Sequence, residues 1–519
     1  MRSRFLRRFR ILFSALVFIC FFILFTDIKY LIPAKYINIL LAFQFIPSIL
    51  KFHDLGTVIA AGFAAVLILT LLTGRTYCSF LCPLGTGQDL FSRIGGRIKK
   101  KFRRYGFKKP FTVIRYTLLA ATILVSIVWG VYLLTLLDPY SIFGRFMTFF
   151  AKPVVILINN FFEGILGRFD VYTLSHIHIT GFQLLAYIIP VIFFLLIGGL
   201  SLTKGRLYCN MICPVGTLLG LLSKVSILRI KFDESKCTRC GRCSLGCKSS
   251  CIDFLQHKVD VSRCVDCFNC INTCQDKALS YGIAGLKNKS VEADPSRRKF
   301  VAGSLLFLFG FQHILRGQNR TAPVPKKDST VKETRTLPVC PPGGISIADF
   351  NMDCTACSLC ISECPNGVLV PALLQYGVAG MMQPVMDYHR SFCTYNCTRC
   401  TEICPTYALH PLALDAKKLT QIGKANFIKD NCIVKTEKTA CGACSEACPT
   451  KAVYMIPYEG NLLIPETNNE ICIGCGHCEF ACPTTPYKAI YIDGNDVHQA
   501  AKKPENVQSE METPVEFPF

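Results

Sequence analysis

Cysteine is the residue whose number and spacing suggest chemistry in this chain of 519 residues, which holds 31 of them. Four runs follow the pattern CxxCxxCxxxC, and two further runs have wider gaps. In two-cluster ferredoxins, three cysteines at this spacing bind one iron–sulfur cube and the fourth binds the neighbouring cube. The six runs therefore predict six [4Fe–4S] clusters, a set suited to passing single electrons along a protein.

The predicted cluster ligands are the four cysteines of each run. The regular runs are Cys237, Cys240, Cys243, Cys247; Cys264, Cys267, Cys270, Cys274; Cys354, Cys357, Cys360, Cys364; and Cys472, Cys475, Cys478, Cys482. The looser runs are Cys393, Cys397, Cys400, Cys404 and Cys432, Cys441, Cys444, Cys448. Crossed ligation assigns Cys237, Cys240, Cys243 and Cys274 to one cube, and Cys264, Cys267, Cys270 and Cys247 to its partner. The same cysteines provide the metal ligands for iron.

Other uses of cysteine fit less well. Structural zinc sites favour two separated CxxC pairs, and disulfide frameworks belong to short secreted chains. The last four runs each end in Cys-Pro, the usual end of a bacterial ferredoxin run, but Lys248 and Gln275 stand there in the first two. Cys251 is an extra thiol and an alternative ligand for the first run, whereas Cys20 and Cys340 are expected to be non-ligands.

The composition points to a membrane. Hydrophobic residues make up 51% of the chain and charged residues 18%, which is too apolar for a wholly soluble protein. The formal net charge is +22, but the bases gather in residues 1–10 and 93–115, beside apolar segments, as the positive-inside rule expects of cytoplasmic loops. This distribution argues against a nucleic-acid partner.

Four apolar segments predict membrane-spanning helices at residues 11–25, 57–73, 112–137 and 182–202. Residues 31–50 are apolar but interrupted by prolines, and predict an interfacial or re-entrant segment outside. The predicted fold is an α-helical membrane domain of four or five spans joined to α+β bacterial-type ferredoxin domains.

An internal repeat lies where two of these spans reach the cytoplasm. Residues 74–86 and 205–217 share the pattern G-R-x-Y-C-x-x-x-C-P-x-G-T. Cysteines four apart share one face of a helix, so Cys78, Cys82, Cys209 and Cys213 are candidates for converging as metal, cluster or redox-thiol ligands. The alternative is that they are small buried apolar side chains.

The two repeats followed by a two-cluster ferredoxin resemble the membrane quinol-dehydrogenase subunit of periplasmic nitrate reductase systems, the NapH type. The part from Ser296 onward is similar to the four-cluster ferredoxin subunit of the same systems, the NapG type. The chain thus looks like a fusion of the two. The resemblance implies electron flow from membrane quinol to a periplasmic acceptor. It also favours nested pairing of the last four runs, first with last and middle with middle, over pairing of neighbours.

The sequence divides into a membrane domain at 1–231, a two-cluster domain at 232–286, an anchor and linker at 287–346, a four-cluster domain at 347–495 and a disordered tail at 496–519. Ser296-Arg297-Arg298-Lys299-Phe300 before the apolar run 301–315 resembles a twin-arginine export signal. It predicts an uncleaved anchor with residues 317–519 in the periplasm. If that run is too short to span, all six clusters stay in the cytoplasm.

The leading hypothesis is a quinol-oxidising, electron-transferring protein of the inner membrane, whose partners are the quinol pool and a periplasmic or membrane-attached electron acceptor. The second is a membrane redox maturation factor for a metalloenzyme, and a redox sensor ranks last. Asp138, His176 and His178 lie near the outer ends of two spans and are candidate proton acceptors, although loop and cap roles are more common for such residues. No Gly-rich dinucleotide fingerprint is present.

Overall fold

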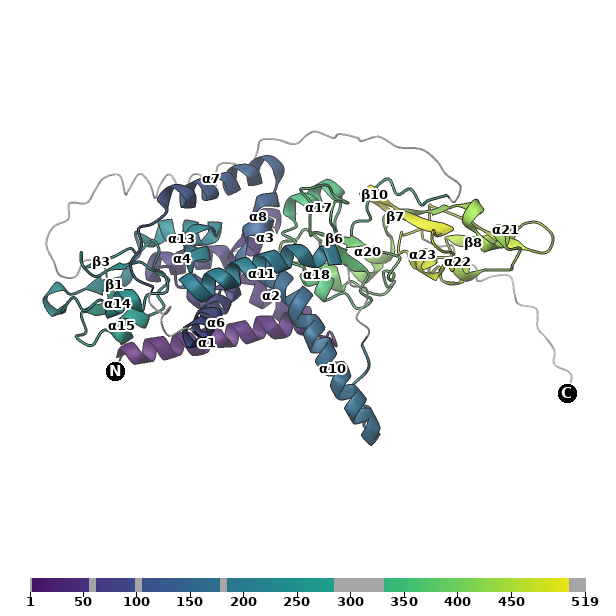
Figure 1. The fold of residues 1–519 in the computed structure, drawn as a ribbon. Coiled ribbons are helices and arrows are strands. Elements are labelled where there is room, and N and C mark those ends of the chain that lie inside the picture. Colours follow the sequence, from purple (N-terminus) through teal and green to yellow (C-terminus); the bar gives the residue numbers. More distant parts are fainter. Residues whose placement is uncertain (1, 56–61, 99–104, 178–183, 284–330, 504–519) are drawn as a thin grey trace.

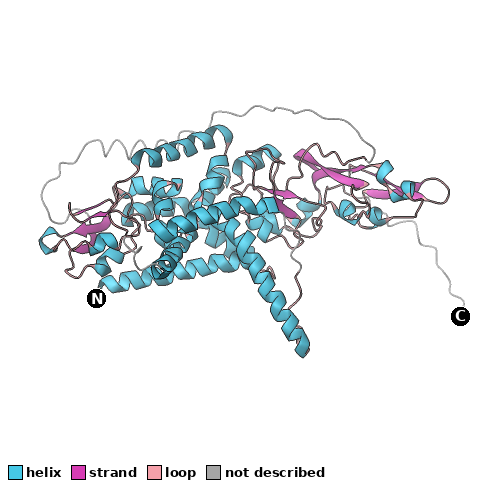
Figure 2. Ribbon diagram, in the orientation of Figure 1, coloured by secondary structure: helices cyan, strands magenta, loops and turns pink. Residues whose placement is uncertain are grey.

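The computed structural model describes residues 2–55, 62–98, 105–177, 184–283 and 331–503. It has a helical domain in the middle and strand-containing units at its two ends (Figure 1 and Figure 2). The twin-arginine segment, the apolar run 301–315, His178 and residues 504–519 lie outside the described residues.

The central domain is built from helices alone. These are α1 (Arg2–Thr26), α2 (Ala34–Ala42), α3 (Phe45–Leu55), α4 (Gly62–Thr73), α5 (Tyr77–Phe80), α6 (Pro83–Ile98), α7 (Thr112–Trp129), α8 (Tyr132–Leu137), α9 (Pro139–Phe146), a π-helical turn (Met147–Ala151), α10 (Lys152–Leu166), a 3-10 turn (Gly167–Phe169), α11 (Leu184–Lys204), α12 (Leu207–Met211) and α13 (Pro214–Ser223). Each repeat forms the same helix–short helix–helix unit, α4–α5–α6 and α11–α12–α13. The units pack crosswise, α6 against α11 and α13 against α4.

Three helices among the described residues are long and apolar enough to cross a membrane: Phe5–Thr26, Pro139–Phe169 and Tyr187–Lys204. The first and third overlap the spans predicted at 11–25 and 182–202. The spans predicted at 57–73 and 112–137 contain the shorter apolar helices Gly62–Thr73 and Thr112–Val128.

The structure differs from the sequence analysis at two places in this domain. The helix predicted over 112–137 ends at Trp129, because Gly130 adopts a left-handed φ of 79° that stops the helix. The helix of 139–169 was not predicted, since the sequence analysis places no span between residues 137 and 182. Its second half, α10, leaves the bundle (Figure 1) and exposes Val154, Leu157 and Phe161.

The two-cluster unit is a small α+β unit at one end. It contains β1 (Leu228–Phe232), a 3-10 turn (Glu234–Lys236), α14 (Arg242–Leu245), β2 (Ile252–Asp253), β3 (Lys258–Val259), α15 (Asn269–Thr273) and β4 (Leu279–Ile283). Strand β1 pairs antiparallel with β4, and β2 with β3. The long pair closes the unit, since it joins the residues before the first cysteine to those after the last.

The four-cluster unit lies at the opposite end of the central domain (Figure 1). It contains α17 (Ile347–Asp353), α18 (Leu359–Ser362), β5 (Leu369–Pro371), β6 (Pro384–Met386), α19 (Arg399–Glu402), α20 (Leu414–Lys418), β7 (Thr420–Phe427), a 3-10 turn (Lys429–Asn431), α21 (Ile433–Thr436), α22 (Ala443–Glu446), β8 (Val453–Pro457), β9 (Leu463–Thr467), α23 (His477–Ala481) and β10 (Ile490–Ala500). The antiparallel pairs are β5–β6, β7–β10 and β8–β9. Strand β10 continues beyond residue 495, where the sequence analysis ended this domain, because its last residues still pair with β7.

Candidate functional site: cluster loops and a membrane thiol group

The four regular cysteine runs share one backbone conformation. In each, the second and fourth residues after the first cysteine have positive φ: Arg239 and Gly241, Asp266 and Phe268, Ala356 and Ser358, Gly474 and Gly476. Left-handed backbone costs about 1–2 kcal/mol for a residue with a side chain, yet five of these eight are not glycine. Such strain persists where function requires the geometry. Here it curls the loop so that three cysteines face one point, which fits a cube.

In the two-cluster unit, the structure brings together the groups expected from crossed ligation. Cys237, Cys240, Cys243 and Cys274 line one pocket, and burial raises the pKa of the Cys243 thiol to about 11. Cys270 lies near the thiols of Cys267, Cys264 and Cys247. Burial and these neighbouring thiols raise the pKa of Cys270. Two four-thiol groups therefore lie side by side, and cluster binding by these residues stays a prediction.

In the four-cluster unit, neighbouring runs pair, in contrast to the nested order that the family resemblance favours. Cys432, Cys441, Cys444 and Cys482 line one pocket, which joins the third run of this unit to its last. Burial and the nearby Cys357, Cys354 and Cys404 thiols raise the pKa of Cys360, which joins the first run to the second. The remaining groups are Cys364, Cys393, Cys397, Cys400 and Cys448, Cys472, Cys475, Cys478.

Neighbouring pairing orders these groups along the unit. Cys393 donates its backbone N–H to the carbonyl oxygen of Cys475, 2.9 Å away, so the two inner groups adjoin. The group that contains Cys357 lies against the membrane domain, because Cys357 packs with Phe21, Phe25 and Phe143. The group that contains Cys432 is then the last of four.

The extra cysteines have different surroundings. Cys251 is buried, with its Sγ 3.5 Å from that of Cys247 and a second contact to Cys264. It thus adjoins two predicted ligands of one cube. Cys340 is fully buried beside Tyr376, and Cys20 is exposed on α1.

The four repeat cysteines lie in one buried apolar cluster, together with Tyr77, Tyr208 and the predicted cluster ligand Cys267. Cys82 and Cys213 each stand directly before the proline that begins a helix. The amide of Gly85 donates to the Cys82 sulfur at 3.4 Å, and that of Gly216 donates to the Cys213 sulfur at 3.3 Å. Both sulfurs therefore lie at helix N-termini, which favour negative charge.

The arginine of each repeat donates hydrogen bonds to the other repeat. Arg206 donates to the carbonyl oxygen of Cys78, and Arg75 donates to that of Cys209 at 3.1 Å. Both arginines are fully buried. A Cβ on Gly85 would lie 2.2 Å from the Cys78 oxygen, so the glycine of the motif is needed for this close approach. The repeat pattern thus encodes a pseudo-twofold site.

The electrostatics of the two repeats differ. Arg206 pairs with Asp89 at 2.9 Å. The Arg75 guanidinium donates to oxygens of Asn210, Ser262 and Cys209, and its Nη2 lies 3.8 Å from the Cys78 sulfur. A buried cation requires a nearby anion. For Arg75 this anion is the buried Asp266, whose carboxylate interacts with it electrostatically.

The candidate proton acceptors have ordinary contacts. Asp138 is buried and caps α9, where its Oδ2 accepts from the amide of Ser141 at 2.8 Å and from its hydroxyl at 2.7 Å. His176 is half-exposed, 3.4 Å from Glu163. The cap role expected for Asp138 is therefore the one observed.

Comparisons with known proteins agree with this geometry. A family profile described as a 4Fe–4S binding domain matches residues 55–102 and again 185–233, so each match contains one Cys-xxx-Cys-Pro motif. A profile described as a 4Fe–4S dicluster domain matches residues 439–486, which contain the third and fourth runs of the four-cluster unit except Cys432.

The ferredoxin-type protein NapH of Escherichia coli is 25% identical over 38% of this chain and 55% of NapH. A putative electron transport protein, YccM of Escherichia coli, is 24% identical over 36% of this chain and 44% of YccM. The methylamine utilization ferredoxin-type protein MauN of Methylobacillus flagellatus is 24% identical over 37% of this chain and 53% of MauN. The chain thus spans about half the length of these relatives, and no solved structure matches it significantly.

Proposed function

We propose that this protein is an inner-membrane electron-transfer protein that oxidises quinol and passes electrons singly through six [4Fe–4S] clusters to a periplasmic reductase. The observation that carries the proposal is the placement of the four repeat thiols. They lie in one buried cluster between two units that each bring a predicted cube ligand, Cys267 or Cys357, into the membrane domain.

The order of groups supports a single path. On one side, Cys267 shares the buried cluster of Cys78, Cys82, Cys209 and Cys213. On the other, Cys357 packs against the face of α9 that carries Tyr140 and Phe143. Tyr208, which lies in the thiol cluster, donates to the carbonyl oxygen of Leu137, just before this helix. Bound clusters would supply one-electron redox chemistry, and these residues would hold them in sequence.

The placement of the two units supports a transmembrane route. They dock at opposite ends of the helical domain (Figure 1), and the two-cluster unit contacts the basic segment 105–115, where the amides of Tyr105 and Lys108 donate to it. We therefore assign that unit to the cytoplasm and residues 317–519 to the periplasm. The crossing between the two compartments then runs through the repeat thiols.

We further propose that the repeat thiols bind an iron–sulfur cluster. Four cysteines, two helix N-termini and two buried arginines suit a negatively charged cluster, and the matching profile is named for one. The second candidate function, a redox maturation factor, uses the same four thiols to load or reduce a metal centre in a partner.

The test is quinol oxidation by anaerobically purified, cluster-loaded full-length protein with a water-soluble one-electron acceptor. We expect turnover in the native protein and none in Cys78→Ser or Cys209→Ser, each with the loss of one cluster's iron. Cys20→Ser is the matched control, because this thiol is exposed and belongs to no run. A full iron content without turnover in the native protein would refute quinol oxidation and favour maturation.

A further inference from the structure

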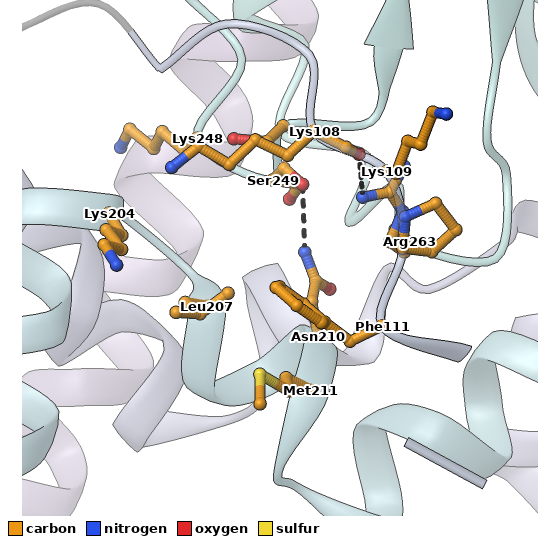
Figure 3. Close-up of a pocket in the computed structure, with 12 residues that line it drawn as sticks. Lys108, Lys109, Phe111, Lys204, Leu207, Asn210, Met211, Lys248, Ser249 and Arg263 are labelled. Atoms are coloured by element: carbon orange, nitrogen blue, oxygen red, sulfur yellow. Dashed lines mark hydrogen bonds between the residues drawn. The ribbon is translucent and has the colours of Figure 1, made fainter. Parts of the chain in front are cut away.

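A basic pocket opens where three segments of the chain meet (Figure 3). Its cations are Lys108 and Lys109, Lys204 at the end of α11, and Lys248 and Arg263 of the two-cluster unit. No acidic side chain is among the described residues that line it. Five cations around one pocket create a positive potential that attracts an anion.

Two buried polar atoms at this pocket have no hydrogen-bond partner in the described chain: Nη2 of Arg263 and the hydroxyl of Ser249. Both residues are 6% exposed. The other nitrogens of Arg263 are used, since Nε donates to Asp260 at 2.6 Å and Nη1 donates to the carbonyl of Lys108 at 2.9 Å. A buried donor without a partner destabilises the folded protein, and a phosphate oxygen is the kind of acceptor that would satisfy it.

The remaining charges divide into two sets. Lys248 pairs with Asp89 at 3.2 Å, and Arg263 pairs with Asp260. Lys108, Lys109 and Lys204 are exposed. The exposed lysines are therefore the part of the site that can turn towards a charged headgroup.

The apolar part of the lining indicates the source of the phosphate. Phe111, Leu207 and Met211 line the pocket, and α7 begins beside it with Val113 74% exposed. A free phosphate would gain no binding energy from these apolar side chains, whereas the acyl chains of a lipid would pack against them. Basic pockets at the cytoplasmic ends of membrane helices suit anionic headgroups.

We propose that this pocket binds the phosphate of an anionic phospholipid. The bound headgroup would contact the membrane domain and the two-cluster unit together, since Lys204 belongs to the first and Ser249 and Arg263 to the second. Lys248 and Arg263 directly adjoin the predicted ligands Cys247 and Cys264 in sequence. The lipid would thus fasten this cluster unit to the membrane domain.

The test is native mass spectrometry of the full-length protein released from nanodiscs of phosphatidylglycerol or phosphatidylcholine. We expect one retained phosphatidylglycerol in the native protein. The triple variant Lys108→Gln, Lys109→Gln, Lys204→Gln should bind it on the order of 100-fold more weakly, at roughly fivefold per lysine. Lys258→Gln with Lys277→Gln is the control, because these exposed lysines do not line the pocket.

Equal retention of phosphatidylglycerol by the triple variant and the native protein would overturn the proposal. So would equal retention of phosphatidylcholine, because the site would then not select anionic lipid. Displacement of the lipid by millimolar inorganic phosphate would assign the site to free phosphate and overturn the lipid source. Resistance to inorganic phosphate, with loss in the triple variant only, supports the proposal.

Discussion

The two ferredoxin units attach to the same helical domain by different chemistry. The two-cluster unit is held by buried ions and by arginines that donate to its backbone. The four-cluster unit is held by aromatic side chains and by a close approach of its backbone to Gly144, where there is no room for a side chain. Units with the same loops therefore do not imply the same mode of docking.

Asp89 is the centre of the two-cluster interface. Its carboxylate accepts from Arg10 at 2.8 Å, from Arg206 at 2.9 Å and pairs with Lys248 at 3.2 Å. These residues come from α1, the second repeat and the two-cluster unit. Burial opposes ionisation of Asp89, but the three cations outweigh it and hold its pKa well below the ordinary value. The ion cluster joins three parts of the chain.

The four-cluster interface combines apolar packing with an ion pair between Arg399 and Glu363, from which Arg399 also donates to the carbonyl of Ile32 at 2.8 Å. Leu359 and Ile403 pack with Phe25 and Phe143 in one apolar cluster. The hydroxyl of Ser362 donates to the carbonyl of Phe25 at 2.8 Å. Apolar contacts depend little on the orientation of the side chains, whereas a buried ion cluster is strongly destabilised when one partner is removed. The two interfaces should therefore respond differently to mutation.

The largest effect is expected from Asp89→Asn. Three buried cations would lose their counter-charge, and breaking a buried ion pair costs about 3–5 kcal/mol. Thermal unfolding in detergent and hydrogen exchange should show lower stability, with the two-cluster unit released and the four-cluster unit retained. Asp415→Asn is the control, since Asp415 is exposed on α20. An unchanged unfolding temperature for Asp89→Asn would contradict the claim that buried ions hold the two-cluster unit on the helical domain.

A smaller effect of about 1–3 kcal/mol is expected from Gly144→Ala. A Cβ at this position would lie 2.3 Å from the carbonyl oxygen of Cys357 and 2.9 Å from the Phe25 ring. The loop that carries Cys357 must then shift. Hydrogen exchange should rise around residues 354–364 and stay unchanged in the two-cluster unit.

The matched control for this change is Gly164→Ala on α10, where a Cβ would meet nothing within 4 Å. Alanine in an exposed helix gains roughly 0.5–1 kcal/mol over glycine. The two substitutions should therefore change stability in opposite directions. A loss of stability in both would mean that the contact with Cys357 is not the cause.

Effects of similar size are expected from one hydrogen-bonding cation at each interface. Arg115 donates to the carbonyl of Ser262 at 2.9 Å, and Lys152 donates to that of Ser362. Arg115→Gln and Lys152→Gln should each cost about 1.5–3 kcal/mol, the usual range for a hydrogen bond to a charged group. Hydrogen exchange should rise near residue 262 in the first variant and near 362 in the second. A change at both places in either variant would show that the two docking surfaces are coupled.

Much of the molecule could be predicted from local sequence. The cysteine spacing predicted the four-thiol groups of the two-cluster unit, because a few residues of backbone decide how such a loop curls. The matching Gly-Arg and Cys-Pro elements predicted that Cys78, Cys82, Cys209 and Cys213 would come together. The helix of 139–169 was missed, because Arg145, Lys152 and Pro153 interrupt its apolar residues.

Sequence alone thus determined which residues carry the chemistry: cysteine runs, repeat motifs and apolar segments are properties of short stretches, read without knowing their neighbours. Only the tertiary structure decided what lies beside what. The crossing of Arg75 and Arg206, the pairing of neighbouring runs in the four-cluster unit and the position of the repeat thiols between Cys267 and Cys357 all depend on contacts between distant residues. Such contacts follow from packing the whole chain, in which Asp89, Gly130 and Gly144 matter because of partners that no local pattern names.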